Sequence, residues 1–324
     1  MREMSYTTLG KTGLRTSVAG LGCGGFSRLG QAQGKSVSES VDVVRAAYDM
    51  GINLFDTAEV YGTEEIVGKA IASSERDGVV ISTKARINSA EELIRPEDVV
   101  KSLHASLKRL KMDSVDIFHL HGVAPKYADY VLDGITEALL REREAGRIKH
   151  LAVSETAPND HQHTAIAKFV ESGHYDVVMV AFHLLHQNAR SKVFPLTQAN
   201  GVGTLLMFAV RLIFSQPERL RATLEELVGA GELPATLLDD PEPMAFLTEQ
   251  DGPAGIMDAA YRYARHEPGV DVVLLGTGSQ EHLRTNVQSI LGDPLSTDAV
   301  RLAEQRFGHL VGVGLDAPRN VLKS

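Results

Sequence analysis

Four side chains that can take part in acid–base chemistry follow three successive apolar runs of the sequence. Asp56 closes the first run and Tyr61 comes shortly after it, Lys84 follows the second run, and His121 follows the third. A lysine ammonium favours the ionised form of a nearby phenol and so lowers its pKa, and an aspartate keeps the lysine charged. Because a neutral imidazole can hydrogen-bond a substrate oxygen, the set predicts a proton donor matched to a developing alkoxide.

Each of these residues also has an ordinary structural explanation. An aspartate at a strand end often caps a turn, a tyrosine often packs in a core, and a lysine is usually a solvated charge. The hypothesis therefore depends on all four lying on one rim, which requires neighbouring parallel strands that end at the same face.

The elements that must position these residues alternate between short apolar runs and longer amphipathic segments. The runs start mostly about 30 residues apart, the length of one βαβ unit, and they are apolar on both faces, as buried parallel strands are. Eight such runs favour a closed α/β fold, the (β/α)8 or TIM barrel, over an open doubly wound sheet. The predicted strands are Val18–Leu21, Ile52–Phe55, Val79–Ser82, Val115–His119, Ile148–Val153, Val177–Ala181, Gly203–Met207 and Val272–Leu275. The predicted helices are Val37–Met50, Pro96–Leu110, Asp129–Glu144, Asn159–Glu171 and Ile256–Arg265.

One long stretch interrupts the repeat. Residues 208–253 contain no barrel strand, but they hold an amphipathic segment, Pro217–Val228, and a proline-rich segment, Leu233–Pro243. Long loops in compact domains are often functional, so this loop after strand 7 is expected to cover the site or to be a plain insertion. An extra helix is expected after the barrel, and residues 1–324 are expected to form a single domain.

Composition excludes several classes of function. The chain has 324 residues, a formal net charge of −9 and no basic run, so neither nucleic acid nor an anionic membrane is an expected partner. The only cysteine, Cys23, rules out an intramolecular disulfide. The N-terminus lacks the apolar core of a signal peptide, and no apolar run is long enough to span a membrane. A cytoplasmic protein is therefore expected, with its oligomeric state left open.

Several motifs resemble the aldo-keto reductase family. Residues 6–22 are similar to the N-terminal signature of that family, and Asp56-Thr-Ala-x-x-Tyr61-Gly is similar to its second-strand motif. Ile81–Lys84 and Asp116–His121 resemble the next two motifs. The resemblance implies a (β/α)8 barrel, a nicotinamide cofactor and hydride transfer between a carbonyl and an alcohol. It also implies a catalytic tetrad of Asp56, Tyr61, Lys84 and His121.

A glycine-rich segment near the end of the barrel indicates where a phosphate would bind. Gly276–Asn286 runs from a predicted strand into a helix, whose first N–H groups and positive dipole end attract an anion, although Gly-Thr-Gly is also an ordinary helix cap. The segment resembles the family's strand-8 phosphate segment. His282, with Arg284 nearby, matches the basic residue that grips a 2′-phosphate, so NADP(H) is favoured and NAD(H) stays open. The resemblance implies these cofactor-binding residues: Gly22, Cys23, Asp56, Ser154, Met179, Met207, Phe208, Gly276, Thr277, Gly278, His282, Arg284 and Asn286.

Three positions depart from the family pattern. The Ser-Asn pair that holds the nicotinamide amide is Ser154-Glu155 here, and the usual Gln on strand 6 is Met179. The aromatic residue that stacks on nicotinamide is matched by Met207 or Phe208. Aldehydes, ketones and aldoses all remain open as substrates.

Other interpretations remain. Gly20-x-Gly22-x-x-Gly25 matches a dinucleotide fingerprint, but a polar loop follows it where a helix is required. His119 and His121, with His183 and His186, suggest the metal site of a barrel hydrolase, although no metal is expected because the ligand set is incomplete. A cofactor-binding regulatory subunit, like the potassium channel β subunits that share this fold, is the third hypothesis.

Overall fold

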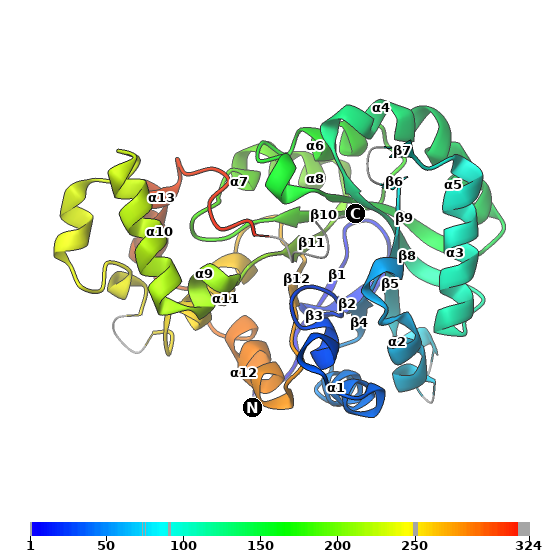
Figure 1. Ribbon diagram of the computed structural model, residues 1–324, viewed down its shortest axis with the longest axis horizontal. Helices are drawn as coiled ribbons and strands as arrows, with labels where there is room; N and C mark the ends of the chain where they lie inside the picture. The colour runs from blue at the N-terminus through cyan, green and yellow to red at the C-terminus, as the bar shows by residue number, and fades with distance from the viewer. Residues whose placement is uncertain (1, 73, 75, 90–91, 249–251, 317–324) are drawn as a thin grey trace.

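A closed parallel barrel forms the centre of the computed structural model, which describes residues 2–72, 74, 76–89, 92–248 and 252–316 (Figure 1). Each strand pairs with the next in chain order, and the last pairs with the first, which closes the barrel. All eight predicted strands are confirmed, so the open-sheet alternative is wrong. The barrel strands are β3 (Ala19–Gly22), β4 (Leu54–Asp56), β5 (Val80–Arg86), β8 (Val115–Val123), β9 (Ile148–Glu155), β10 (Val177–Ala181), β11 (Gly203–Met207) and β12 (Val272–Leu275).

The barrel is filled with side chains, and a hairpin closes its N-terminal end. An inner apolar cluster gathers residues from seven of the strands, including Leu54, Ile117 and Leu205. The hairpin of β1 (Tyr6–Thr8) and β2 (Arg15–Ser17), which was not expected from sequence, adds the fully buried Leu9 to this cluster. Because side chains fill the interior and the hairpin closes the N-terminal end, a ligand site is expected at the C-terminal face of the barrel.

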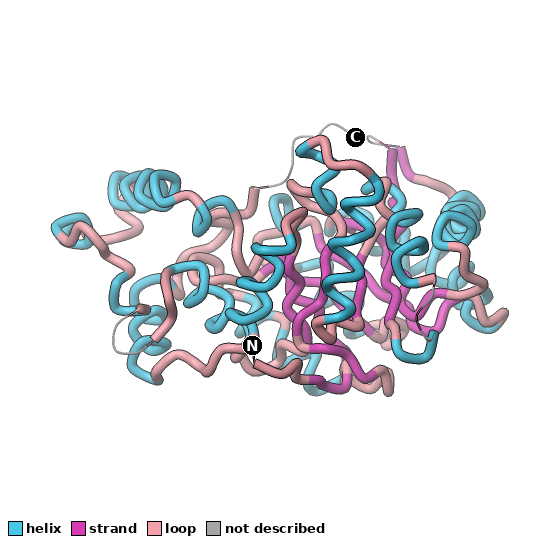
Figure 2. Tube along the Cα trace, turned by 90° about the horizontal axis from the view of Figure 1, so that it is seen from below, coloured by secondary structure: helices cyan, strands magenta, loops and turns pink. Residues whose placement is uncertain are grey.

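Helices surround the barrel, as Figure 2 shows. The outer helices are α1 (Val37–Asp49), α2 (Glu64–Ile71), α3 (Pro96–Leu110), α5 (Thr136–Glu144), α6 (Thr164–Glu171), α8 (Phe194–Asn200), α11 (Ile256–Arg265) and α12 (Gln280–Ile290). Shorter elements are η1 (Arg28–Gln33), η2 (Glu59–Tyr61), η3 (Arg76–Gly78), β6 (Asn88–Ser89), β7 (Glu92–Leu93), η4 (Pro125–Tyr127), α4 (Ala128–Tyr130), the π-helical η5 (Val131–Ile135), η6 (Ala157–Asn159) and α7 (Ala189–Lys192).

Two predicted helices differ from the structure. The helix expected over Asp129–Glu144 is interrupted by the π turn η5. The helix expected from Asn159 begins instead at Thr164, because the Asp160 carboxylate accepts hydrogen bonds from the backbone N–H groups of Thr164 (2.9 Å) and Ala165 (2.8 Å). These bonds satisfy donors that a longer helix would have used internally.

The stretch after β11 forms a helical lobe beside the barrel. It contains α9 (Leu212–Ser215), α10 (Pro217–Gly229), η7 (Ala235–Asp239) and η8 (Ala245–Leu247), and residues 249–251 lie outside the described part. The expected C-terminal helix, α13 (Thr297–Phe307), packs on this lobe, with the rings of Phe246 and Phe307 6.5 Å apart.

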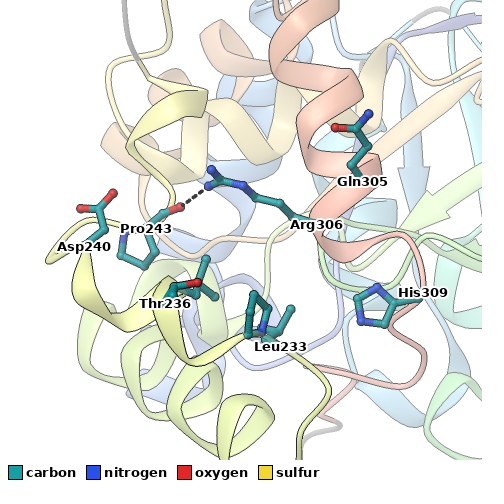
Figure 3. A pocket seen from close by; sticks show the side chains of 9 residues that line it. Leu233, Thr236, Asp240, Pro243, Gln305, Arg306 and His309 are labelled. Carbon is teal, nitrogen blue, oxygen red and sulfur yellow. Dashed lines mark hydrogen bonds between the residues drawn. The ribbon is translucent and has the colours of Figure 1, made fainter.

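The lobe and α13 lie together at one side of the barrel in Figure 1. The first residues of the stretch, from Phe208 to the start of α9, directly follow β11 at the C-terminal end of the barrel, so this part of the insertion lies at the mouth. Its apolar side chains, among them Leu237 and Leu247, are buried within the lobe. A groove of 340 Å³ remains between the lobe and α13, crossed by a hydrogen bond of 3.3 Å from Arg306 to the Pro243 carbonyl (Figure 3). No helix in the described part of the chain is long and apolar enough to cross a membrane.

Candidate active site at the C-terminal end of the barrel

The structure brings the four predicted acid–base residues together at the C-terminal ends of three neighbouring strands. Asp56 is the last residue of β4, Lys84 lies on β5, and His121 lies on β8. Tyr61 ends η2, directly after β4. In the barrel register Asp56 pairs with Ser82, and Lys84 pairs with His119. Lys84 and His121 therefore each lie two positions beyond the residue that pairs with the preceding site residue, on adjacent strands that point to the same face.

A buried ion pair lies at the bottom of the site. Lys84 is fully buried, and its ammonium donates to Asp56 Oδ2 (2.5 Å) and to the carbonyl of Thr57 (2.9 Å). Ser82 donates to the other carboxylate oxygen of Asp56 at 2.7 Å. Burial alone would lower the pKa of Lys84, but the charge of Asp56 and the neighbouring Tyr61 raise it, so the lysine stays charged.

Tyr61 lies next to the Lys84–Asp56 ion pair. Its hydroxyl lies 3.2 Å from His121 Nε2, and the Lys84 ammonium lies 5.2 Å from the centre of its ring. The ring packs against Gly24, where an added Cβ would lie 2.4 Å from a ring carbon. Arg28, which sequence reasoning missed, holds the loop by donating from Nε to the Tyr61 carbonyl at 2.7 Å.

The expectation of a lowered phenol pKa is wrong for this structure. Withdrawal from water raises the pKa of Tyr61 above its ordinary value, and the opposing effect of the Lys84 ammonium is smaller. Tyr61 is therefore a neutral phenol at neutral pH, which is the form that can donate a proton. Sequence could not settle this balance, because the degree of burial depends on the packing of the loop.

His121 is a neutral imidazole. Burial, followed by the Lys84 charge, holds its pKa well below the ordinary value. Its Nδ1 is buried and has no hydrogen-bond partner among the described residues. The neighbouring His119 points into the barrel core and is fully buried. Within the described ranges, no three potential metal-ligand side chains converge, and His183 and His186 bond to each other through their backbones.

The strand-8 segment joins β12 to α12, as the sequence predicts. Ser279 caps α12 by accepting a hydrogen bond from the His282 N–H (3.4 Å), and Gly276 lies next to Gly22 on the adjacent strand β3. His282 and Arg284 are exposed. A cation that the sequence did not suggest, Lys35, donates to the Gly278 carbonyl at 2.6 Å.

Two departures from the family pattern, Glu155 and Met179, are buried residues with structural partners. Glu155 is buried, accepts from the Ala181 N–H (2.7 Å) and pairs with His163 Nδ1 (2.7 Å). Ser154 Oγ accepts from the Gly122 N–H at 2.9 Å. Met179 lies in the inner apolar cluster of the barrel. Glu155 therefore holds the ends of β9 and β10 together and presents no free oxygen to the barrel mouth.

The end of β11 forms an apolar wall at the mouth. Phe208 has a φ of 70°, a strained left-handed conformation for an aromatic residue. Together with Met207 it packs on Ala181 and on Leu315 from the chain after α13. That C-terminal chain, red in Figure 1, runs from α13 back toward β10, and its Leu315 adds to this wall.

Comparison with known proteins agrees with this geometry. A family model described as "Aldo/keto reductase family" matches residues 20–305. The chain belongs to the aldo-keto reductase family. The predicted family and the predicted barrel fold are therefore confirmed.

Curated relatives of this aldo-keto reductase have different names and different extents of match. Aldo-keto reductase YhdN of Bacillus subtilis is 30% identical over 211 residues, which is 63% of this chain and 61% of YhdN. L-galactose dehydrogenase of Arabidopsis thaliana is 29% identical over 63% of this chain and 65% of its own. These two matches span less than two thirds of either relative. A putative voltage-gated potassium channel subunit beta of Schizosaccharomyces pombe is 26% identical, with 89% of each chain covered.

Solved structures share the fold. Aldo-keto reductase AKR11C1 from Bacillus halodurans, in its holo form, superposes with a TM-score of 0.70 at 21% identity, covering 97% of this chain and 100% of its own. Thermostable aldo-keto reductase Tm1743, in complex with the inhibitor epalrestat, superposes with a TM-score of 0.68 at 24% identity, covering 93% and 99%. At these identities the likeness shows the barrel architecture alone.

Proposed function

We propose that this aldo-keto reductase interconverts a carbonyl and an alcohol, with Tyr61 as the general acid of reduction and the general base of oxidation. One observation carries the proposal: the hydroxyl of Tyr61 lies 3.2 Å from His121 Nε2, beside the buried Lys84–Asp56 pair. A partly exposed phenol that has a charged lysine behind it and a neutral imidazole beside it can exchange a proton with a substrate oxygen.

Each residue has one role in this mechanism. Bound nicotinamide supplies the hydride for reduction and takes it up in oxidation. Tyr61 passes its proton from the phenolic oxygen to the carbonyl oxygen, while His121 fixes the direction of that oxygen by a hydrogen bond. Lys84 offsets the negative charge that develops on the phenol, and Asp56 keeps the lysine charged and in place.

The donor set of the strand-8 segment fits the phosphates of a nicotinamide cofactor. The first N–H groups of α12 lack intrahelical acceptors, and Lys35 adds a positive charge beside Gly278. NADP(H) is the favoured cofactor and NAD(H) the alternative, because exposed His282 and Arg284 offer positive charge to a 2′-phosphate. The residues proposed to line the cofactor site are Gly22, Cys23, Asp56, Ser154, Met179, Met207, Phe208, Gly276, Thr277, Gly278 and Asn286.

The substrate class is a small aldehyde, a ketone or an aldose. The similarity to L-galactose dehydrogenase supports including sugars, oxidised in the reverse direction. A panel of carbonyls and polyols with both cofactors, followed by nicotinamide absorbance, would identify the substrate. The similarity to a putative channel β subunit over 89% of both chains supports a second candidate, a cofactor-binding regulatory subunit. Cofactor binding without turnover on this panel would favour that candidate.

The replacement Tyr61→Phe tests the catalytic assignment. It removes the hydroxyl and keeps the ring that packs on Gly24, so the fold and the affinity for cofactor should change little. The kcat should fall at least about a hundredfold, the usual scale for losing a general acid. A kcat close to that of the unmodified enzyme would refute the role of Tyr61.

A further inference from the structure

Arg211 occupies an unusual position at the mouth of the barrel. It lies in the loop that leads from β11 into α9, and only 9% of its surface is exposed. Its guanidinium lies between two aromatic rings, 3.8 Å from the centre of Phe208 and 4.8 Å from the centre of Phe26. Since Phe26 follows β3, and β12 separates β11 from β3 in the barrel, the side chain reaches across the end of β12.

The guanidinium lacks the partners that buried arginines need. Its Nε and Nη2 atoms are both buried and make no hydrogen bond to any described residue. These two atoms form the side-on edge of the guanidinium, which matches the two oxygens of a carboxylate or phosphate. The same edge is filled elsewhere in this molecule: Arg262 donates from Nε (2.9 Å) and Nη2 (2.8 Å) to the carboxylate of Asp258. Arg190 likewise donates from both atoms to Glu267.

The nearby acid does not fill this edge. Asp316, from the chain after α13, attracts Arg211 through space, but its Oδ1 accepts a hydrogen bond from Arg219 at 3.0 Å, and its buried Oδ2 makes no hydrogen bond to Arg211 or to any other described residue. Burial lowers the pKa of Arg211 to about 10, which still leaves the guanidinium charged at neutral pH. A buried, charged and unpaired guanidinium is costly for a fold to retain.

We propose that Arg211 binds an oxyanion of a ligand at the barrel mouth through its Nε and Nη2 donors. The anion is either a carboxylate on the carbonyl substrate or a phosphate of the cofactor, which present the same pair of oxygens. The ring of Phe26 beside the guanidinium is 37% exposed, so this contact lies at the surface of the mouth. This inference rests on the proposed function, because it assumes that substrate and cofactor meet at this mouth.

Two substitutions separate anion binding from packing. Arg211→Met keeps a long apolar side chain between the two rings and removes the donors. Arg211→Lys keeps the charge but loses the side-on pair of donors, so it serves if the methionine variant folds poorly. The matched control is Arg219→Met, which removes an exposed neighbouring cation that pairs with the same Asp316.

Two equilibrium titrations identify the source of the anion without turnover. The first measures the Kd of NADPH by its fluorescence, which is free of tryptophan background because the chain has no Trp. The second measures, by calorimetry on the NADPH-saturated protein, the Kd of 4-(hydroxymethyl)benzoate and of its neutral methyl ester. A cofactor phosphate predicts a weaker NADPH complex for the Arg211 variants, and a substrate carboxylate predicts a weaker complex with the benzoate only.

The expected loss is about ten- to hundredfold in the affected Kd, the scale of a hydrogen bond to a charged group. Arg219→Met should stay within about threefold of the unmodified protein, as expected for an exposed pair. If the Arg211 variants and the Arg219 control gave equal Kd values in both titrations, the inference would be overturned. Turnover on the carbonyl panel would still test the proposed function separately.

Discussion

The contact between Gly24 and Tyr61 allows the position of the phenol to be tested without touching the phenol itself. An alanine Cβ at position 24 would lie 2.4 Å from one carbon of the Tyr61 ring and 2.6 Å from two others, one of which carries the hydroxyl. Carbon atoms in ordinary contact stay about 3.5–4.0 Å apart, so the ring would have to move by about 1 Å. The Gly24 backbone itself is not left-handed, so alanine strains nothing else there.

We therefore expect Gly24→Ala to lower kcat by about a hundredfold, the cost of misplacing a reacting group by about 1 Å. Overpacking of this kind also destabilises a protein by about 1–3 kcal/mol, so thermal unfolding should show a folded enzyme with a somewhat lower Tm. Steady-state kinetics on the best substrate of the panel, with the Kd of NADPH as a check on the cofactor site, would measure the effect.

The control is Gly25→Ala in the same loop. Gly25 has a φ of 69° and nothing within 4 Å of an added Cβ, so alanine there strains the backbone but does not contact Tyr61. In a double-mutant cycle, Gly24→Ala should cost no further kcat once Tyr61 is phenylalanine, because the displaced ring no longer carries the proton. An unchanged kcat for Gly24→Ala, or an equal loss in both backgrounds, would refute the reasoning.

Three further perturbations test the charges around the site. Lys84→Met removes the charge that partly offsets the effect of burial on the pKa of Tyr61, so this pKa should rise further. The increase in kcat for alcohol oxidation with rising pH should therefore occur at higher pH. An unmoved pH profile of kcat would contradict this coupling. Asp56→Asn leaves the buried Lys84 ammonium without its charge partner and should destabilise the protein by about 3–5 kcal/mol in urea unfolding, while adding Lys84→Met should recover much of the loss. The double replacement His282→Glu with Arg284→Glu should weaken NADPH more than NADH in fluorescence titrations, and an unchanged ratio would place the 2′-phosphate elsewhere.

Sequence patterns predicted the barrel because the strands of a parallel barrel are buried on both faces. Such burial leaves continuous apolar runs, and all eight runs became strands, with Val177–Ala181, Gly203–Met207 and Val272–Leu275 matching residue for residue. The hairpin before β3 was missed because its strands are only three residues long. The late start of α6 was missed because it depends on where the Asp160 side chain points.

By itself the sequence determined which chemical groups reach the mouth. Asp56, Lys84 and His121 follow from their places at or near the strand ends, since parallel strands deliver their C-terminal residues to one face. Tertiary structure decided what those groups do there. Burial reversed the expected direction of the Tyr61 pKa, and chain segments distant in sequence brought Lys35 to Gly278 and placed Arg211 between two rings. The ionisation of a side chain and the ion pairs that it forms depend on distances through space and on the exclusion of water. Neither quantity can be calculated from the spacing of residues along the chain.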